Sequence, residues 1–167
     1  MELKISLIIK EAISYDEGDS KRINHFLKVF SFAKSIGELE KLDLKRQYIL
    51  EIAAVLHDIG IKVSEKKYKS SAGKYQEIEG PSIAEEILGN LEIEEDIIKR
   101  VSYLIGHHHT YKDIDNIDYQ ILIEADFLVN IYEDNIGDKE IKLIRDKYFK
   151  TKTGIEFLTR MYLNDLS

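Results

Sequence analysis

The sequence predicts an all-α protein, a single compact helical bundle of about six to eight helices. Three observations support this prediction. Apolar residues recur three and four positions apart along nearly the whole chain, which is the period of an amphipathic helix. Turn-forming residues are scarce, with Pro 1 and Gly 9, and this disfavours a fold of many short strands. The 167 residues, 44% of them hydrophobic, suffice for one domain with one core.

Most expected helices begin or end at a residue typical of that position. Ser20 and Asp43 are suitable N-caps, and Pro81 suits a first helical turn. Gly60 and Gly89 are expected to end their helices. The expected helices span residues 3–14, 20–37, 43–60, 81–89, 94–105, 118–134, 138–149 and 153–163. The chain, 1–167, is expected to be one domain, with a core at about 20–135 on which the helices of 138–163 pack.

Two segments depart from the regular amphipathic pattern. Residues 61–79 have no clean helical period and are rich in lysine, so we expect a long loop that is mobile or functional. The helix at 118–134 is apolar on nearly all sides and is expected to be the buried central helix. Within it, Asp126 needs a cation, a metal or a network of donors, because a buried carboxylate without a partner is costly. Glu124 lies about 200° around the helix from Asp126 and is expected to face solvent, whereas Asn130, one turn on, is expected to orient Asp126.

The charge and cysteine counts exclude several classes of protein. The formal net charge is -7, with Lys+Arg 24 against Asp+Glu 31, so we expect neither a nucleic-acid polymer nor a membrane as a partner. Cys is 0, which excludes disulfides, thiolate metal sites and thiol nucleophiles. No stretch has the apolar length of a signal peptide or a membrane span, so we expect a cytoplasmic location. A homodimer is compatible with these counts.

All the histidines fall into an ordered series with two aspartates. The series runs His25, then His57-Asp58, then His107, His108 and His109, then Asp126. Imidazole and carboxylate groups are ligands of divalent transition metals. Each member alone has an ordinary structural explanation. These are a histidine bonded to a backbone carbonyl, a helix end, a solvated loop, and an ion pair of Asp126 with Arg100, Arg145 or Lys147. Taken together in this order, they are much less readily explained by coincidence.

The ordered set resembles the HD-domain superfamily of metal-dependent phosphohydrolases. The resemblance rests on Arg22 three residues before His25, on the text VLHDIG, and on EADFLVNI around Asp126, and it covers about residues 20–135. It implies an HD-type helical domain that hydrolyses a phosphate ester or anhydride with the help of a divalent metal, Mn, Fe, Co, Ni or Zn. The metal ligands that it implies are His25, His57, Asp58 and Asp126.

Members of the superfamily with two metals use further histidines between the His-Asp pair and the last Asp. Here a second ion would draw on Glu79, His107 and His108, but no histidine lies between Asp58 and His107. Glu77 or Glu79 could supply an oxygen ligand in its place. Otherwise the site holds one ion. The sequence therefore leaves one or two ions open.

The function that follows is hydrolysis of a small phosphorylated metabolite, with a nucleotide as the expected substrate. We expect the segment 61–79 to be a lid whose lysines meet the phosphate and locally reverse the negative field. The expected catalytic residues are Asp58, His107 and His108, and the expected substrate-binding residues are Arg22, Lys62, Lys74 and His109. The alternatives are a cyclic-dinucleotide or alarmone hydrolase, or a non-catalytic regulatory domain that binds a metal or a nucleotide.

Overall fold

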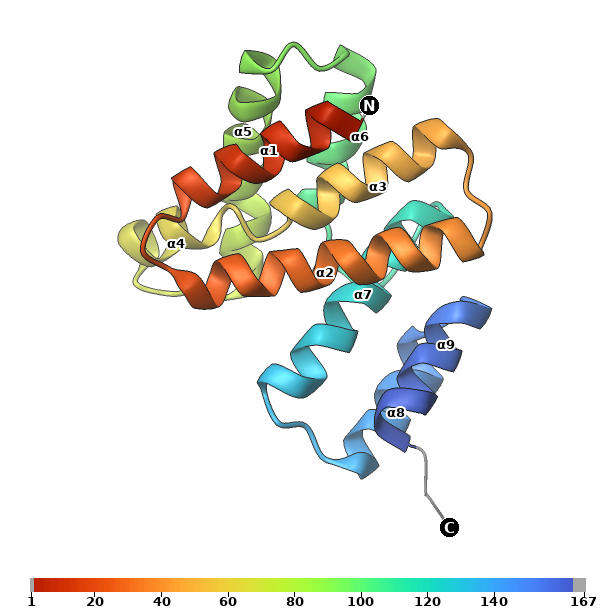
Figure 1. Cartoon of the computed structure of the whole chain (residues 1–167). Helices are drawn as coiled ribbons and strands as arrows, with labels where there is room; N and C mark the ends of the chain where they lie inside the picture. Colours follow the sequence, from red (N-terminus) through yellow and green to blue (C-terminus); the bar gives the residue numbers. More distant parts are fainter. Residues whose placement is uncertain (1, 164–167) are drawn as a thin grey trace.

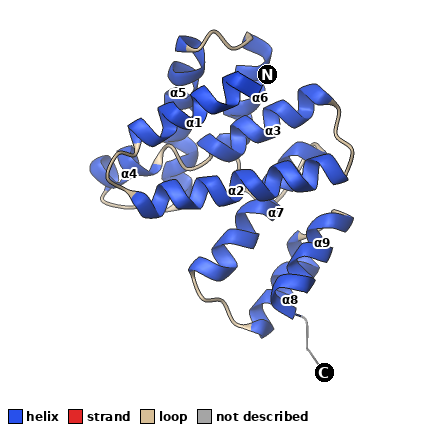
Figure 2. Cartoon of the chain, viewed as in Figure 1, coloured by secondary structure: helices blue, strands red, loops and turns tan. Residues whose placement is uncertain are grey.

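The structure is a computed structural model that describes residues 2–163, and every regular element in this part of the chain is helical (Figures 1 and 2). The elements are α1 (Glu2–Tyr15), α2 (Ser20–Leu39), α3 (Leu44–Leu56), α4 (Ile61–Tyr68), α5 (Gly73–Asn90), α6 (Glu95–Ile105), α7 (Ile117–Glu133), α8 (Asp138–Tyr148), α9 (Lys152–Leu158) and a π-helical turn, Thr159–Leu163. The all-α prediction is confirmed. The predicted domain also includes Met1 and residues 164–167, which lie outside the described part.

Helix α7 occupies the centre of the fold, as its apolar sequence predicted. It crosses α2, which also packs along α3, and α3 in turn contacts α6 and α7 (Figure 1). Helices α5 and α6 pair on the side of α3 away from α8 and α9. Helices α8 and α9, which follow α7 in the sequence, pack against α7. Four of these helices (α2, α3, α6 and α7) therefore place their facing residues around one core, and the functional side chains lie at its edge.

The helix ends agree with the sequence analysis in some places and differ in others. Asp43 is the N-cap of α3 and accepts a hydrogen bond from the backbone N–H of Arg46, as predicted. The N-cap of α2 is Asp19 rather than Ser20, because the Asp19 carboxylate reaches the backbone N–H of Arg22. Helix α3 ends at Leu56, at the end of a buried run that begins at Tyr48 and before the predicted stop at Gly60. His57 and Asp58 consequently lie in the turn that follows α3.

The expected loop at 61–79 is mostly helical, so that prediction is wrong. Helix α4 fills 61–68 and α5 begins at Gly73, which leaves a short connection of residues 69–72. Pro81 lies inside α5 rather than in its first turn. The buried stripe of α5 has the regular spacing of a helix, but its first two members are Gln76 and Gly80. A pattern search based on apolar residues therefore misses the first half of this helix.

Glu124 is buried rather than exposed, which corrects the sequence analysis. Its carboxylate accepts hydrogen bonds from the backbone N–H groups of Lys150 and Thr151 and from the side chains of Thr151 and Gln120. This face of α7 is covered by the connection between α8 and α9, which the sequence pattern of α7 alone does not reveal. Burial raises the pKa of Glu124, while the donors that surround it oppose that shift.

Two glycines bring the turn after α3 into direct contact with α5. A Cβ atom added at Gly60 would lie 2.7 Å from the backbone nitrogen of Gly80 and 2.8 Å from the carbonyl oxygen of Gln76. Both are backbone atoms of a packed helix, so neither can move aside alone. Gly60 thus serves the close approach of two segments rather than a helix stop.

We expect Gly60→Ala to lower the free energy of unfolding by about 2 kcal/mol, because the new methyl group overpacks this crossing. Gly89→Ala is the matched control, since a Cβ atom there meets nothing within 4 Å and the helical backbone gains propensity. Chemical denaturation of the three proteins measures both effects. Equal stability of Gly60→Ala and the unchanged protein would show that α5 can move away without cost.

None of the helices in the described part of the chain has the length and apolar character that crossing a bilayer requires.

Candidate metal centre

Four side chains from three separate segments meet at the edge of the core. His25 comes from the second turn of α2, His57 and Asp58 follow α3, and Asp126 comes from the middle of α7. The Nε2 atom of His25 lies 3.2 Å from Nε2 of His57, 3.4 Å from Oδ2 of Asp58 and 3.2 Å from Oδ1 of Asp126. Nε2 of His57 lies 3.5 Å from Oδ2 of Asp58 and 3.6 Å from Oδ1 of Asp126. The structure therefore brings together the four residues that the resemblance implied as ligands.

The hydrogen bonds on the far side of each imidazole ring determine which nitrogen carries the proton. Nδ1 of His57 lies 2.8 Å from the carbonyl oxygen of Ala54, and a carbonyl oxygen can only accept. Nδ1 of His25 lies 2.8 Å from a carboxylate oxygen of Glu133, which is held as an acceptor in the same way. Both rings must donate from Nδ1, so in the neutral rings both Nε2 lone pairs point at one another and at the two aspartates.

This arrangement fits a divalent metal ion. Two imidazole lone pairs and two carboxylate oxygens converge without a donor among them, so their mutual repulsion needs a cation or added protons. Ligands on adjacent positions of a transition metal lie about 3 Å apart when the metal–ligand bonds are about 2.1 Å, and the distances above are of that size. The environment of His108 also fits a metal ion. Its Nε2 atom is buried and has no hydrogen-bond partner, and it lies 3.4 Å from Oδ1 of Asp58.

Without a metal, protons on the histidines take over the role of the cation. Burial disfavours a charged His25, but the carboxylates of Asp126 and Asp58 outweigh burial and raise the pKa of His25 to about 9. The pKa of His57 is raised in the same sense, against its own burial. The paired histidines in turn hold the pKa of Asp126 well below its usual range, although burial acts the other way. The metal-free centre is therefore a compact network of imidazolium and carboxylate groups.

These shifts predict how the stability of the metal-free protein depends on pH. The folded-state pKa of His25, about 9, exceeds its ordinary value of 6.5. Protonated His25 therefore contributes up to about 3 kcal/mol to the free energy of unfolding. This contribution is complete below pH 6.5 and is lost as the pH rises through 9. Thermal unfolding of chelator-treated protein between pH 6 and 9.5 measures the loss. His25→Gln should weaken this dependence and leave the part that comes from His57, whereas His107→Gln should keep it in full. A metal-free protein whose stability is unchanged over this range would contradict the assigned pairing.

A second group of metal-ligand type shares Asp58 with the first. One ligand atom each from Asp58, His108 and His109 lies within 4.8 Å of the others. Like His57, His108 directs Nδ1 to a backbone carbonyl, that of Ile105, at 2.8 Å. Nε2 of His109 lies 3.0 Å from the amide oxygen of Gln76. Burial and the neighbouring His108 lower the pKa of His109 to about 4, so this ring is neutral near pH 7.

Two residues expected at a second ion lie elsewhere. His107 bonds the carbonyl of Tyr103 through Nδ1 and stacks on the Tyr103 ring, with ring centroids 4.2 Å apart. Glu79 accepts hydrogen bonds from Lys67 and Tyr68 between α4 and α5. The structure thus groups His109 with Asp58 and His108, in place of His107 and Glu79. Neighbouring residues on a turn face different directions, and the sequence alone does not reveal which of three consecutive histidines faces inward.

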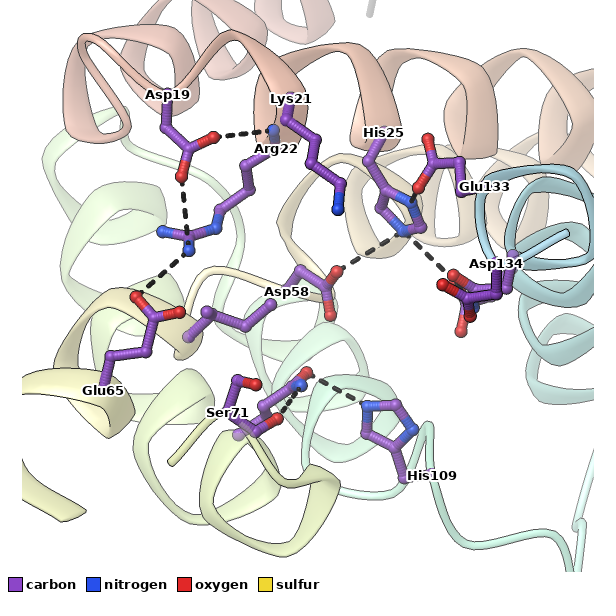
Figure 3. A pocket seen from close by; sticks show the side chains of 14 residues that line it. Asp19, Lys21, Arg22, His25, Asp58, Glu65, Ser71, His109, Glu133 and Asp134 are labelled. Atoms are coloured by element: carbon purple, nitrogen blue, oxygen red, sulfur yellow. Dashed lines mark hydrogen bonds and ion pairs between the residues drawn. The ribbon is translucent and has the colours of Figure 1, made fainter. Parts of the chain in front are cut away.

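Three of the four candidate ligands, His25, Asp58 and Asp126, line a pocket of about 490 Å³ between α2, α4, α5 and α7 (Figure 3), whereas His57 is fully buried and does not line it. Arg22 lines it, as predicted, and lies 3.5 Å from Asp16, 3.3 Å from Asp19 and 3.3 Å from Glu65. Lys21, which the sequence analysis did not select, also lines the pocket, and its side chain extends toward Asp58 and His25 in Figure 3. One feature of the sequence could have identified Lys21 as a pocket residue, namely its position next to Arg22 and four residues before His25.

The structure does not bring the predicted lysines of 61–79 to this pocket. Lys62 donates to the carbonyl of Tyr15, and Lys74 lies over the ring of Tyr75, 4.7 Å from its centroid. Neither residue lines the pocket. Because 61–68 is helical, its side chains are distributed around an axis, and the lysines fall on the sides that face away from the ligands.

Two residues on α7 support the ligands from behind. Asn130 donates to Oδ1 of Asp126 at 2.9 Å, as its spacing predicted. Glu133, which the sequence analysis missed, accepts from His25 and also pairs with Lys28 at 2.7 Å. Glu133 follows Asp126 by seven residues, so both lie on one face of α7. Arg100, which the sequence offered as an ion-pair partner for Asp126, donates instead to Asp115 and Asp118.

Comparison with known proteins agrees with this geometry. Residues 22–146 match the family described as HD domain. The chain is also similar to a crystal structure described as a predicted HD superfamily hydrolase from an uncultured Thermotogales bacterium, with 25% sequence identity and a TM-score of 0.63. That alignment covers 96% of this chain and 83% of the other. Comparison with curated protein sequences gives no significant match.

Proposed function

Because this chain belongs to the HD domain family, whose members are generally metal-dependent hydrolases, we propose that it is a phosphohydrolase acting on a small phosphorylated metabolite such as a nucleotide. The observation that carries the proposal is the convergence of two Nε2 lone pairs and two carboxylates on one point at the base of a pocket. The proposed metal ligands are His25, His57, Asp58 and Asp126. His108 and His109 are the proposed additional ligands if a second ion binds beside Asp58.

A divalent ion in this centre would polarise a phosphoryl oxygen and lower the pKa of water. The protein supplies the positions of the other groups. Lys21 and Arg22 border the same pocket and can meet the non-bridging oxygens of a phosphate. In the overall reaction, the oxygen of water forms the new P–O bond and the P–O bond to the leaving group breaks. One proton of water ends on the leaving oxygen and the other on the released phosphate.

Three residues hold the ligands in place for this chemistry. Glu133 keeps the ring of His25 in the tautomer whose Nε2 faces the centre. Asn130 fixes the orientation of Asp126. Gln76 fixes His109 from α5 and is itself anchored through its amide nitrogen to the carbonyl of Ser71. The pocket therefore needs little rearrangement of side chains when substrate binds, which favours rapid turnover.

Metal content and phosphate release test the proposal together. We expect protein loaded with Mn, Co or Zn to release inorganic phosphate from members of a panel of phosphorylated metabolites. Chelator treatment should stop the release and the same metal should restore it. Stoichiometric metal without release from any compound would favour the regulatory binding domain over the enzyme. A cyclic dinucleotide or an alarmone in the same panel distinguishes the other alternative. Their products are separated by chromatography, because hydrolysis yields a linear dinucleotide or pyrophosphate rather than inorganic phosphate.

A further inference from the structure

Resting on the proposed function, we infer that the substrate is a phosphate monoester of a hydroxyl-rich alcohol, a sugar phosphate or a nucleoside monophosphate, rather than a nucleoside di- or triphosphate. The inference comes from the charges and the chemistry of the pocket wall beyond the metal ligands.

The wall of the pocket is rich in carboxylates even when the two ligand aspartates are set aside. The remaining acidic lining residues are Asp19, Glu65, Glu133 and Asp134, and the basic ones are Lys21 and Arg22. A chain with a net charge of -7 thus keeps its negative character at the mouth of its own candidate active site. A substrate with four negative charges would meet more repulsion here than one with two.

The two cations are not equally available to a phosphate. Arg22 is already surrounded by Asp16, Asp19 and Glu65, and it donates a hydrogen bond to Glu65. Among the pocket residues that the structure describes, Lys21 is the cation whose side chain has no hydrogen bond or ion pair. With one ready cation beside the metal centre, the pocket matches one phosphoryl group. Among the described lining residues, no second unpaired Lys or Arg side chain is available to bind a β- or γ-phosphate.

The rest of the wall is suited to hydroxyl groups. Within the described chain, no Phe, Tyr or Trp side chain lines the pocket, so a nucleobase would find no aromatic ring to stack on. Ser71, Gln76 and Asn130 supply hydroxyl and amide groups, and Asp134 supplies a carboxylate with no hydrogen bond or ion pair of its own. Asp134 is exposed and directly follows Glu133 at the C-terminal end of α7. A carboxylate with free lone pairs accepts from the hydroxyls of a sugar and repels a further phosphate.

The test compares kcat/KM of the metal-loaded protein for ribose 5-phosphate, a nucleoside 5′-monophosphate and the matching triphosphate. Free metal is held constant, because triphosphates chelate it, and ionic strength is low, because salt screens the effect. We expect each monophosphate to exceed the triphosphate by at least about tenfold. Asp134→Asn should narrow that ratio by about two- to fivefold. Glu140→Gln is the matched control, because it removes one exposed carboxylate from α8 outside the pocket and should leave the ratio unchanged.

The outcomes separate this inference from the proposed function. Phosphate release that is equal or faster with the triphosphate would overturn the inference and leave the phosphohydrolase standing. If Asp134→Asn leaves the ratio of kcat/KM between monophosphates and triphosphate unchanged, Asp134 does not reject the triphosphate. If no compound releases phosphate, calorimetric binding of the same three compounds decides. Tighter binding of the monophosphates would uphold the inference while the proposed reaction fails. The monophosphate with the higher kcat/KM shows whether the hydroxyl groups that the pocket accepts belong to a sugar phosphate or to a nucleotide.

Discussion

Asp58→Asn should remove metal binding and phosphate release together. Asp58 belongs to both groups of candidate ligands, since its Oδ2 faces His25 and His57 and its Oδ1 faces His108. The substitution keeps the shape of the side chain but removes its charge and one of its two acceptor oxygens. We expect bound metal to fall from stoichiometric to a small fraction, and phosphate release to fall by about 10³-fold or more.

The control for Asp58→Asn is the same exchange at Asp146, which lies exposed on α8 and does not line the pocket. Asp146→Asn should bind metal and release phosphate at the ordinary rate. Metal analysis by mass spectrometry and a phosphate assay are carried out on both variants, with circular dichroism to show that each is folded. An Asp58→Asn protein that retained both metal and activity would exclude this centre as the site of hydrolysis.

Glu124→Ala should cause the largest loss of stability of any single change considered for this chain. The substitution removes the acceptor of the backbone N–H groups of Lys150 and Thr151 and one of the two acceptors of the Gln120 amide, and the bonds of Thr151 and Gln120 to Glu124 are buried. We expect a loss of about 3 to 5 kcal/mol, which corresponds to roughly 10 °C in the unfolding temperature. Thermal and denaturant unfolding measure it.

Two further variants define the cause of that loss. Glu124→Gln keeps one acceptor oxygen and the volume, so it should cost about half as much. Glu156→Ala removes an exposed carboxylate of α9 that pairs with Arg160, and it should cost about 0.5 kcal/mol or less. One cooperative transition in all variants would support the proposal that the helices of 138–163 belong to the same domain as the core. Separate transitions would show that they unfold on their own.

The resemblance, together with side chains whose chemistry is unusual for their surroundings, was sufficient to predict which four side chains meet at the candidate metal centre. Asp126 interrupts the most apolar helix of the chain, and the His57-Asp58 pair follows the buried helix α3. Such residues need partners, and the partners are few in a chain of this composition. The all-α class was predictable for a related reason, since the helical period is repeated in nearly every segment.

The wall of the pocket was much less predictable. Lys21 and Asp134 are exposed charged residues, and in a sequence they do not differ from the many charged residues that only meet water. The position of Glu124 depended on a segment 26 and 27 residues away that covers it. The first half of α5 was missed because its contact with the turn after α3 uses a glycine where a pattern search expects an aliphatic residue. Each failure concerns a contact between segments that are distant in the sequence.

The hydrogen bonds behind the histidines also bear on how this centre tolerates genetic change. His57 and His108 follow α3 and α6, and each uses a carbonyl from the last turn of its helix, where intrahelical partners are missing. A main-chain carbonyl persists whatever side chain occupies position 54 or 105, so no substitution there removes the acceptor. His25 depends instead on a side chain, that of Glu133. Accumulated substitutions would therefore leave the orienting hydrogen bonds of His57 and His108 intact. A substitution at position 133 would remove that of His25.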